Sequence, residues 1–182
     1  MTRFEIALFI SANLVLVSLA GSRARTADSQ ANAPKSITLP APDRSAGMTL
    51  NRALAARRSV REFSEERLSP AHLSQLLWAA QGITDSSGHR TAPSAGAKYP
   101  LELYVVLPEG LYHYVAKNHQ LVKTVDGDLH KSLAEAALAQ ESILKAPAVF
   151  IISAVSARTE ARYGPERTPR YVAMEAGHAA QN

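Results

Sequence analysis

Hydrophobic positions recur with helical spacing in the stretch that follows Thr49, and they predict two helices there. The first helix has Thr49 as its cap and continues through Arg57. The second has a serine cap and a proline in its first turn at Ser69-Pro70, and Gly82 ends it. Trp78 lies in this second helix, where we expect it to pack in the core.

The next part of the chain changes to strand spacing. Three short runs with alternating apolar residues are separated by turn residues, which predicts a meander of strands over residues 101–107, 111–115 and 121–125. A continuous apolar run over residues 148–154 predicts a strand that is covered on both faces.

Helical spacing returns on both sides of this last strand. Asp128 is the expected cap of a helix that runs through Gln140, and a polar loop over residues 156–169 leads into a final helix with Met174 and Glu175. Helices that alternate with short antiparallel strands predict an α+β domain, with a mostly antiparallel central sheet flanked by helices.

The beginning of the chain predicts export. An apolar run from Ile6 to Ala20 follows a short, weakly positive start, and small residues allow cleavage after Ala20 or Ala24. We therefore expect residues 1–20 to be a signal peptide and the protein to be exported, with the periplasm as its compartment. An uncleaved membrane anchor is the alternative, although the run is shorter than the about 20 residues of a spanning helix.

A linker separates this signal from the domain. Residues 21–47 are rich in Ala, Ser and Pro and show no apolar period, so we predict a disordered linker followed by a single domain over residues 48–182. Near the end of the linker, the segment 37–42 is expected to be extended along the domain surface.

Composition removes several classes of function. The chain of 182 residues has a formal net charge of +4 and no cysteine, so disulfides and thiolate chemistry are excluded. Its Lys and Arg residues do not form long basic blocks with interleaved aromatics, and we therefore expect no nucleic-acid partner. Its histidines lack the spacing of metal ligands, and we predict no metal site.

A group of basic residues follows the first helix. Arg57, Arg58 and Arg61 fall close to Ser59, and guanidinium groups with a hydroxyl suit a phosphate group. The alternative is a basic, solvated end of a helix. A second stretch, Pro93-Ser-Ala-Gly-Ala-Lys-Tyr-Pro100, favours the first interpretation. Its small residues would let the backbone approach a flat ring, so the two stretches together suit a ligand that has both a phosphate and a flat ring.

Three segments together resemble a known family. Arg57-Arg-Ser-Val-Arg-Glu-Phe63, Pro93 to Pro100, and Glu175-Ala-Gly-His-Ala-Ala-Gln-Asn182 resemble the FMN-binding nitroreductase superfamily, and more narrowly its SagB-type dehydrogenase branch, which is related to azoline oxidases. The resemblance covers residues 37–182. It implies a nitroreductase-like fold and a homodimer that holds FMN at the subunit interface.

The resemblance also implies roles for individual residues. One group would hold the phosphate and ribityl chain of FMN, and a second would line the isoalloxazine: Arg57, Arg58, Ser59 and Arg61 for the first, and Pro93, Ser94, Ala95 and Gly96 for the second. Lys98 and Tyr99 would be catalytic, with the lysine as a base beside the flavin. The alternative for this pair is a surface lysine beside a packing tyrosine.

The resemblance leaves two functions open. The first is an exported FMN-dependent oxidoreductase that transfers hydride between a small-molecule or peptide donor and an acceptor. The second is a non-catalytic exported module with a degenerate flavin site.

Family members continue beyond the segment that ends at Asn182, so we expect the domain to be incomplete at its C-terminus. Export argues against NAD(P)H as the donor, and we expect Glu175 to be a helix-face or interface carboxylate.

Overall fold

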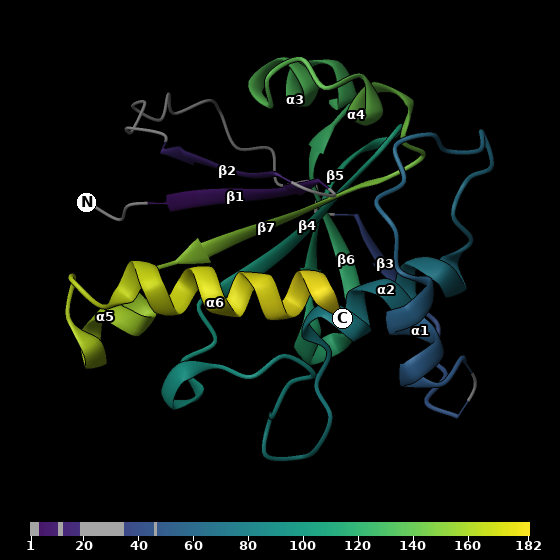
Figure 1. Ribbon diagram of the computed structural model, residues 1–182. Coiled ribbons are helices and arrows are strands. Elements are labelled where there is room, and N and C mark those ends of the chain that lie inside the picture. The colour runs from purple at the N-terminus through teal and green to yellow at the C-terminus, as the bar shows by residue number, and fades with distance from the viewer. Residues whose placement is uncertain (1–3, 11–12, 19–34, 46) are drawn as a thin grey trace.

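A single antiparallel sheet organises the chain. The computed structural model describes residues 4–10, 13–18, 35–45 and 47–182. Its seven strands lie in the order β2-β1-β7-β4-β5-β6-β3, and all neighbours are antiparallel (Figure 1). The strands are β1 (Phe4–Ile10), β2 (Asn13–Ser18), β3 (Ser36–Thr38), β4 (Leu101–Leu107), β5 (Gly110–Val115), β6 (Gln120–Asp126) and β7 (Val149–Val155). The predicted class and the mostly antiparallel sheet are confirmed.

Helices flank this sheet, and the caps of the first two are those expected from the sequence. Thr49 Oγ1 accepts the backbone N–H of Arg52 at 3.4 Å, and Ser69 Oγ accepts that of His72 at 3.1 Å. The α-helices are α1 (Leu50–Ala56), α2 (Pro70–Gln81), α3 (His130–Ala136), α4 (Glu141–Lys145), α5 (Ala157–Tyr163) and α6 (Thr168–Gln181), with 3₁₀ turns η1 (Ala95–Ala97) and η2 (Ala116–Asn118).

Two helix predictions were wrong. The helix expected through Gln140 ends at Ala136, because Leu138 and Ala139 take left-handed conformations with φ of 60° and 54° and turn the chain into α4. The polar stretch expected as a loop over residues 156–169 contains α5 and the start of α6. This stretch has no apolar stripe to reveal a helix, but Gly164 ends α5 with a φ of 76°.

The two faces of the sheet carry separate hydrophobic clusters. Alternate residues of β4 point to opposite faces, so that Leu103 and Val105 pack in the larger cluster with α2 and α6, and Val106 packs in the smaller one. Ile143 of α4 is the largest fully buried residue that the helices add to the smaller cluster. In Figure 1, α6 lies across the front of the sheet and α3 and α4 lie at its upper end.

The segment before the first helix is part of the fold. β3 pairs with β6, and Leu39 directly after it is buried and donates its N–H to the carbonyl of His119 at 3.1 Å. The Pro40 carbonyl accepts a hydrogen bond from Ser74 Oγ at 2.7 Å. Ile37 and Thr38, the first residues of the segment expected to be extended, lie in β3, and this part of the predicted linker joins the sheet before the predicted domain boundary at residue 48.

The predicted signal peptide, residues 1–20, supplies β1 and β2, which extend the sheet beyond β7. Both expected cleavage sites and most of the predicted linker, residues 21–34, lie outside the described residues. Among the described helices, none combines the length and the apolar character that crossing a membrane requires.

A glycine controls the hairpin that joins β4 and β5. Gly110 has a φ of 150°, and a Cβ at this position would lie 2.2 Å from the carbonyl oxygen of Val125 on the neighbouring strand. Gly88 also has a positive φ, 84°, but a Cβ there would meet no atom within 4 Å. The two positions therefore separate the cost of backbone strain from the cost of a clash.

We expect Gly110→Ala to lower the free energy of unfolding by about 3 kcal/mol or more, because the clash with Val125 adds to the strain of a left-handed residue. Gly88→Ala serves as the matched control and should cost only about 1 kcal/mol. Urea denaturation of both variants measures the difference. Equal losses would contradict the clash at Val125.

Candidate functional site

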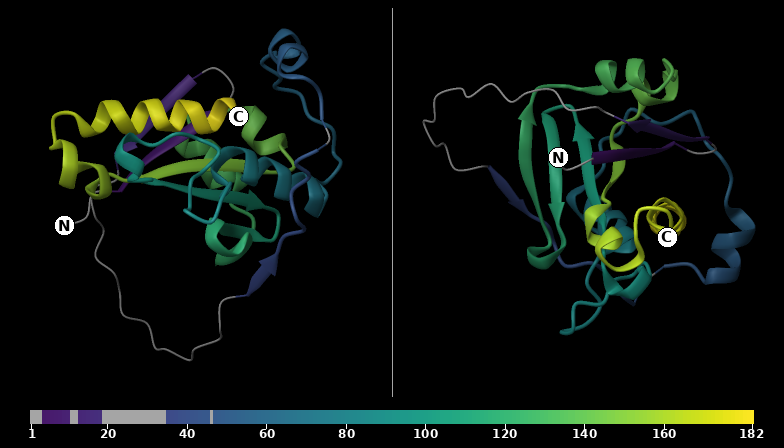
Figure 2. Two further views of the ribbon diagram at one scale, coloured as in Figure 1. Left: turned by 90° about the horizontal axis from the view of Figure 1, so that it is seen from below. Right: turned by 90° about the vertical axis from the view of Figure 1, so that its left-hand side faces the viewer.

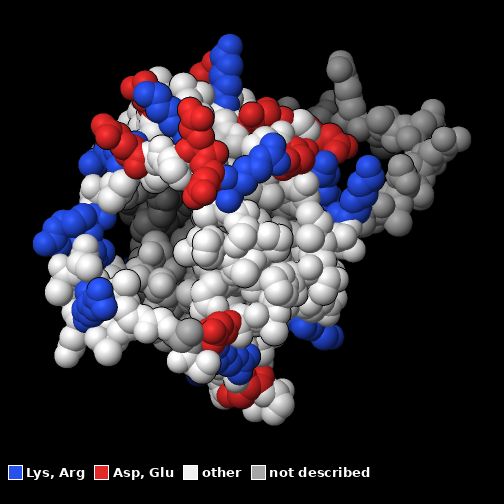
Figure 3. All heavy atoms as spheres, turned by 90° about the vertical axis from the view of Figure 1, so that its right-hand side faces the viewer, with Lys and Arg blue, Asp and Glu red and all other residues white. Residues whose placement is uncertain are grey.

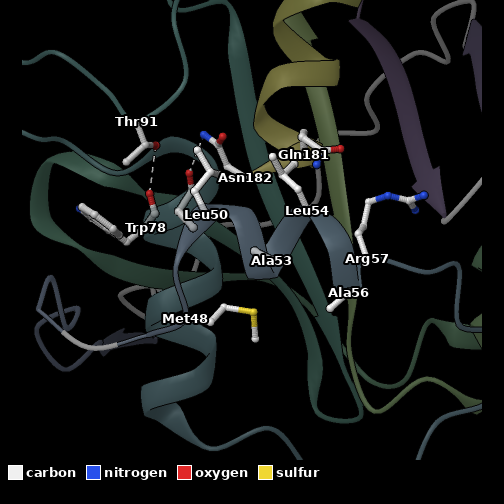
Figure 4. Close-up of a pocket in the computed structure, with 11 residues that line it drawn as sticks. Met48, Leu50, Ala53, Leu54, Ala56, Arg57, Trp78, Thr91, Gln181 and Asn182 are labelled. Atoms are coloured by element: carbon white, nitrogen blue, oxygen red, sulfur yellow. Dashed lines mark hydrogen bonds between the residues drawn. The ribbon is translucent and has the colours of Figure 1, made fainter.

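A cavity of about 610 Å³ lies between α1, α2 and the end of α6. Its volume falls within the roughly 300–1,000 Å³ that is usual for small-molecule sites. Figure 4 shows the residues around it, which come from segments far apart in the sequence. The lining residues are Met48, Leu50, Ala53, Leu54, Ala56, Arg57, Trp78, Ala79, Thr91, Gln181 and Asn182.

Most of this lining is apolar, with polar groups placed between the apolar side chains. Thr91 Oγ1 donates to the Trp78 carbonyl at 3.1 Å, and Asn182 Nδ2 donates to the Ala79 carbonyl at 3.1 Å (Figure 4). These bonds hold two polar side chains of the lining on α2. The cavity therefore suits a ligand with a flat apolar part and a few polar groups.

Trp78 does not pack in the core as the sequence predicted. It is half-buried and forms part of the cavity wall, with the guanidinium of Arg44 5.4 Å from the centre of its ring. Its indole Nε1 is buried and has no hydrogen-bond partner among the described residues. An indole N–H usually finds a partner when it is buried. Figure 4 shows this one at the end of the ring that points away from the other lining side chains, so the cavity meets the ring of Trp78 and not its N–H.

Helix α1 forms one wall of the cavity and projects from the body of the molecule (Figure 2). None of its residues is buried, and Leu50 and Leu54 keep 72% and 55% of their surface exposed. An amphipathic helix normally buries its apolar side, so this side of α1 lacks its cover within the described chain.

The arginine cluster begins at the cavity and leaves it. Arg57, at the end of α1, is part of the lining, and Ser59 and Arg61 follow in an exposed segment. Arg58 folds back onto α1, where its Nη1 donates to the carbonyls of Ala55 and Arg57 at 3.1 and 2.7 Å. In Figure 3, Lys and Arg side chains stand on one side of a hollow, Lys, Arg, Asp and Glu side chains are mixed above it, and the opposite side is uncharged. Convergence of these arginines on one phosphate stays a prediction.

The second predicted segment forms a tight turn before β4. Pro93 and Lys98 are exposed, whereas Ser94 and Tyr99 are half-buried. The turn begins two residues after Thr91, which lines the cavity. The ring of Tyr99 lies under the guanidinium of Arg90, 4.9 Å from its centre. The half-buried tyrosine and the exposed lysine leave both interpretations of the pair open.

The structure adds charged residues that the sequence did not single out. Arg158 of α5 donates to the Tyr99 carbonyl at 3.0 Å, and its second nitrogen pairs with Glu102 at 2.5 Å. Glu102 also contacts His113 Nε2 at 2.6 Å. Burial tends to raise the pKa of Glu102, but His113 and Arg158 together hold it below the ordinary value. The sequence offered one sign of this cluster, which is the charged residue Glu102 within the otherwise apolar strand β4.

Glu175 was expected on a helix face or at an interface, and the structure shows it buried inside the chain. Its Oε1 accepts the backbone N–H of Ala95 at 2.9 Å, which ties α6 to the turn. Among the described residues, no group of three or more His, Asp or Glu side chains is arranged to hold a metal ion.

Comparisons with known proteins agree with one another. The model of the nitroreductase family matches residues 54–182. A protein of Methanocaldococcus jannaschii named "Putative nitroreductase" is 47% identical over 135 residues, which are 71% of this chain and 68% of that protein.

Solved structures show the same relationship. The crystal structure of a "putative nitroreductase" from Ralstonia eutropha JMP134 has a TM-score of 0.72 at 35% identity. The match covers 90% of this chain and 75% of that one. The Escherichia coli microcin synthetase complex has a TM-score of 0.54 at 22% identity, over 86% of this chain and 67% of that one, which shows a shared fold. The sequence match over most of the chain, together with this fold, establishes that the chain belongs to the nitroreductase family.

Proposed function

We propose that the protein is an FMN-dependent oxidoreductase of the SagB-type branch. The observation that carries this proposal is the cavity between α1, α2 and α6, where apolar walls meet Arg57 and the polar side chains of Thr91 and Asn182. These features suit FMN, which has a flat ring system with polar edges and an anionic phosphate. The motif with Lys98 and Tyr99 supports the branch.

The cofactor would be held by the two predicted segments. Arg57, Arg58, Ser59 and Arg61 would bind the phosphate and ribityl chain, since two or three guanidinium groups neutralise a phosphate monoester. The turn from Pro93 to Gly96 would line the isoalloxazine, where small side chains allow close approach. When bound, FMN supplies hydride transfer at its N5 atom.

Lys98 and Tyr99 would act on the substrate. Lys98 is exposed in the turn that would line the isoalloxazine, and its amine would accept a proton from a small-molecule or peptide donor. Tyr99 is held in place by Arg90 and Arg158, which favours an orienting role for its side chain. No nucleic acid takes part in this proposal.

We further propose that the protein is a homodimer with FMN at the interface. The exposed apolar side of α1 supports this assembly, because Leu50 and Leu54 border both the cavity and the solvent. A second copy of the chain on this side would bury these leucines and close the cavity. The expected gain is roughly 1.5–3 kcal/mol for each leucine that becomes fully buried.

We also propose export to the periplasm, supported by the apolar start of the sequence. Cleavage near Ala20 or Ala24 would remove β1 and β2 and leave β7 at the edge of the sheet. An exported enzyme would need a donor other than NAD(P)H. Sequencing the N-terminus of the protein from the cell envelope tests the proposal, and an intact Met1 would contradict it.

Arg57→Ala and Arg61→Ala should each weaken FMN binding by about 1.5–3 kcal/mol, the contribution of a hydrogen bond to a charged group. Titration of the apoprotein with FMN measures the affinity. Arg170→Ala is the control, since Arg170 is exposed in the first turn of α6, far along that helix from the cavity. Unchanged affinity in both cluster variants would reject the phosphate assignment. A wild-type protein that binds no FMN would favour the non-catalytic module.

Leu54→Glu should convert the dimer to monomers and lower the FMN content with it, because a buried unpaired carboxylate opposes association. Sedimentation measures the oligomeric state. Leu138→Glu is the matched control, since Leu138 is 77% exposed on the connection between α3 and α4. A Leu54→Glu variant that stays dimeric would place the interface elsewhere.

Lys98→Ala should slow the reduction of bound FMN by roughly 10²–10⁴-fold when the donor requires proton abstraction. Reduction by an artificial hydride donor should change little, because that reaction needs no base. Stopped-flow recording of the flavin absorbance measures both rates, with Lys117→Ala at an exposed position as the control. Equal losses with the two donors would argue against a base.

A further inference from the structure

The turn from Ser94 to Tyr99 holds an unfavourable backbone conformation. Gly96, Ala97 and Tyr99 all have left-handed φ values, 58°, 52° and 45°. Ala and Tyr avoid this region, and each such residue costs of the order of 1 kcal/mol or more. A conformation of this kind persists only when its surroundings fix it.

Three hydrogen bonds that involve side chains fix the turn, in addition to the backbone bonds from Ala97 to Ser94 and from Lys98 to Ala95. Glu175 Oε1 accepts the N–H of Ala95 at 2.9 Å at the start of the turn. Inside the turn, Ser94 Oγ accepts the N–H of Tyr99 at 2.8 Å. At its end, Arg158 donates to the carbonyl of Tyr99 at 3.0 Å. Lys98, between these points, stays exposed.

Glu175 is the buried member of this set. It lies on α6 with 4% of its surface exposed, and its carboxylate faces the turn. Burial raises its pKa, against the hydrogen bonds from Ala95 and Ser94 and the nearby His178, which act in the opposite direction. A buried carboxyl group is costly unless it is hydrogen-bonded, so Glu175 and the turn depend on each other.

We propose that Glu175 is a positioning residue, which acts through its hydrogen bond to Ala95 and fixes the turn that presents Lys98 and Tyr99. The significance of this role for catalysis rests on the proposed function. The anchoring itself belongs to the protein without FMN. It concerns a carboxyl group to which the proposed function assigns neither a cofactor contact nor the proton transfer.

The apoprotein tests this anchoring with a protease that cleaves after lysine. Cleavage between Lys98 and Tyr99 requires the turn to open, whereas cleavage after the exposed Lys131 on α3 reports on the rest of the molecule. We expect Glu175→Ala to speed cleavage after Lys98 by about tenfold or more, the effect of losing a hydrogen bond to a charged group. Cleavage after Lys131 should keep its rate.

Two further variants separate a hydrogen bond from general destabilisation. Glu175→Gln keeps an oxygen that can accept the Ala95 N–H, so it should retain most of the protection. Glu135→Gln changes an exposed glutamate on α3 and should have no effect. If Glu175→Ala does not fold, Glu175→Asp tests the same contact, because its shorter side chain withdraws the carboxylate from Ala95.

The outcomes distinguish this inference from the proposed function. Unchanged cleavage after Lys98 in Glu175→Ala, or equal acceleration after Lys131, would overturn the positioning role even if the protein binds FMN and is active. Selective acceleration after Lys98, with rescue by Glu175→Gln, would support the role even if the wild-type protein binds no FMN. In an active holoprotein, Glu175→Ala should lower kcat for a donor that needs Lys98 more than it raises KM.

Discussion

The antiparallel pairing of β4 with β7 is the contact on which the candidate site depends. The two strands pair from Leu101 with Ala154 through Val106 with Val149. The turn at residues 94–99 precedes β4, and α5 and α6 follow β7, so this register places them at the same end of the sheet. Arg158 and Glu175 reach the turn for this reason. A shift of one residue would turn the side chains of β4 to the opposite faces and separate the two hydrophobic clusters from their helices.

The elements of the fold could largely be predicted from local patterns, because most helices and strands here have a clear apolar period and cap or turn residues. The failures have physical causes. Leu138 and Ala139 end α3 in left-handed conformations although both residue types favour helices, so helix propensity pointed the wrong way here. α5 is short and polar, so periodicity gave no sign of it. β3 is a strand because it pairs with β6, and its own three residues do not reveal this partner.

The candidate site was predictable only in part. Local motifs pointed to the arginine cluster and to the turn before β4, and the structure places Arg57 in the cavity lining. The contact between Glu175 and Ala95 joins residues 80 positions apart, and no local pattern reports such a pair. Trp78 has the spacing of a core residue, but the cavity beside α1 leaves it at a wall. Which residues face a cavity depends on how helices pack, and this is a property of the whole fold.

The short strand β3 also determines where the chain tolerates shortening. It lies at the edge of the sheet, where it pairs with β6, and the buried Leu39 and the Pro40 carbonyl hold it there. A protein that began at residue 48, the boundary predicted from the sequence, would leave the hydrogen-bonding groups of β6 uncovered. Such a free edge is a template on which strands of other molecules can add, so the cost of this shortening would be aggregation more than a loss of the site.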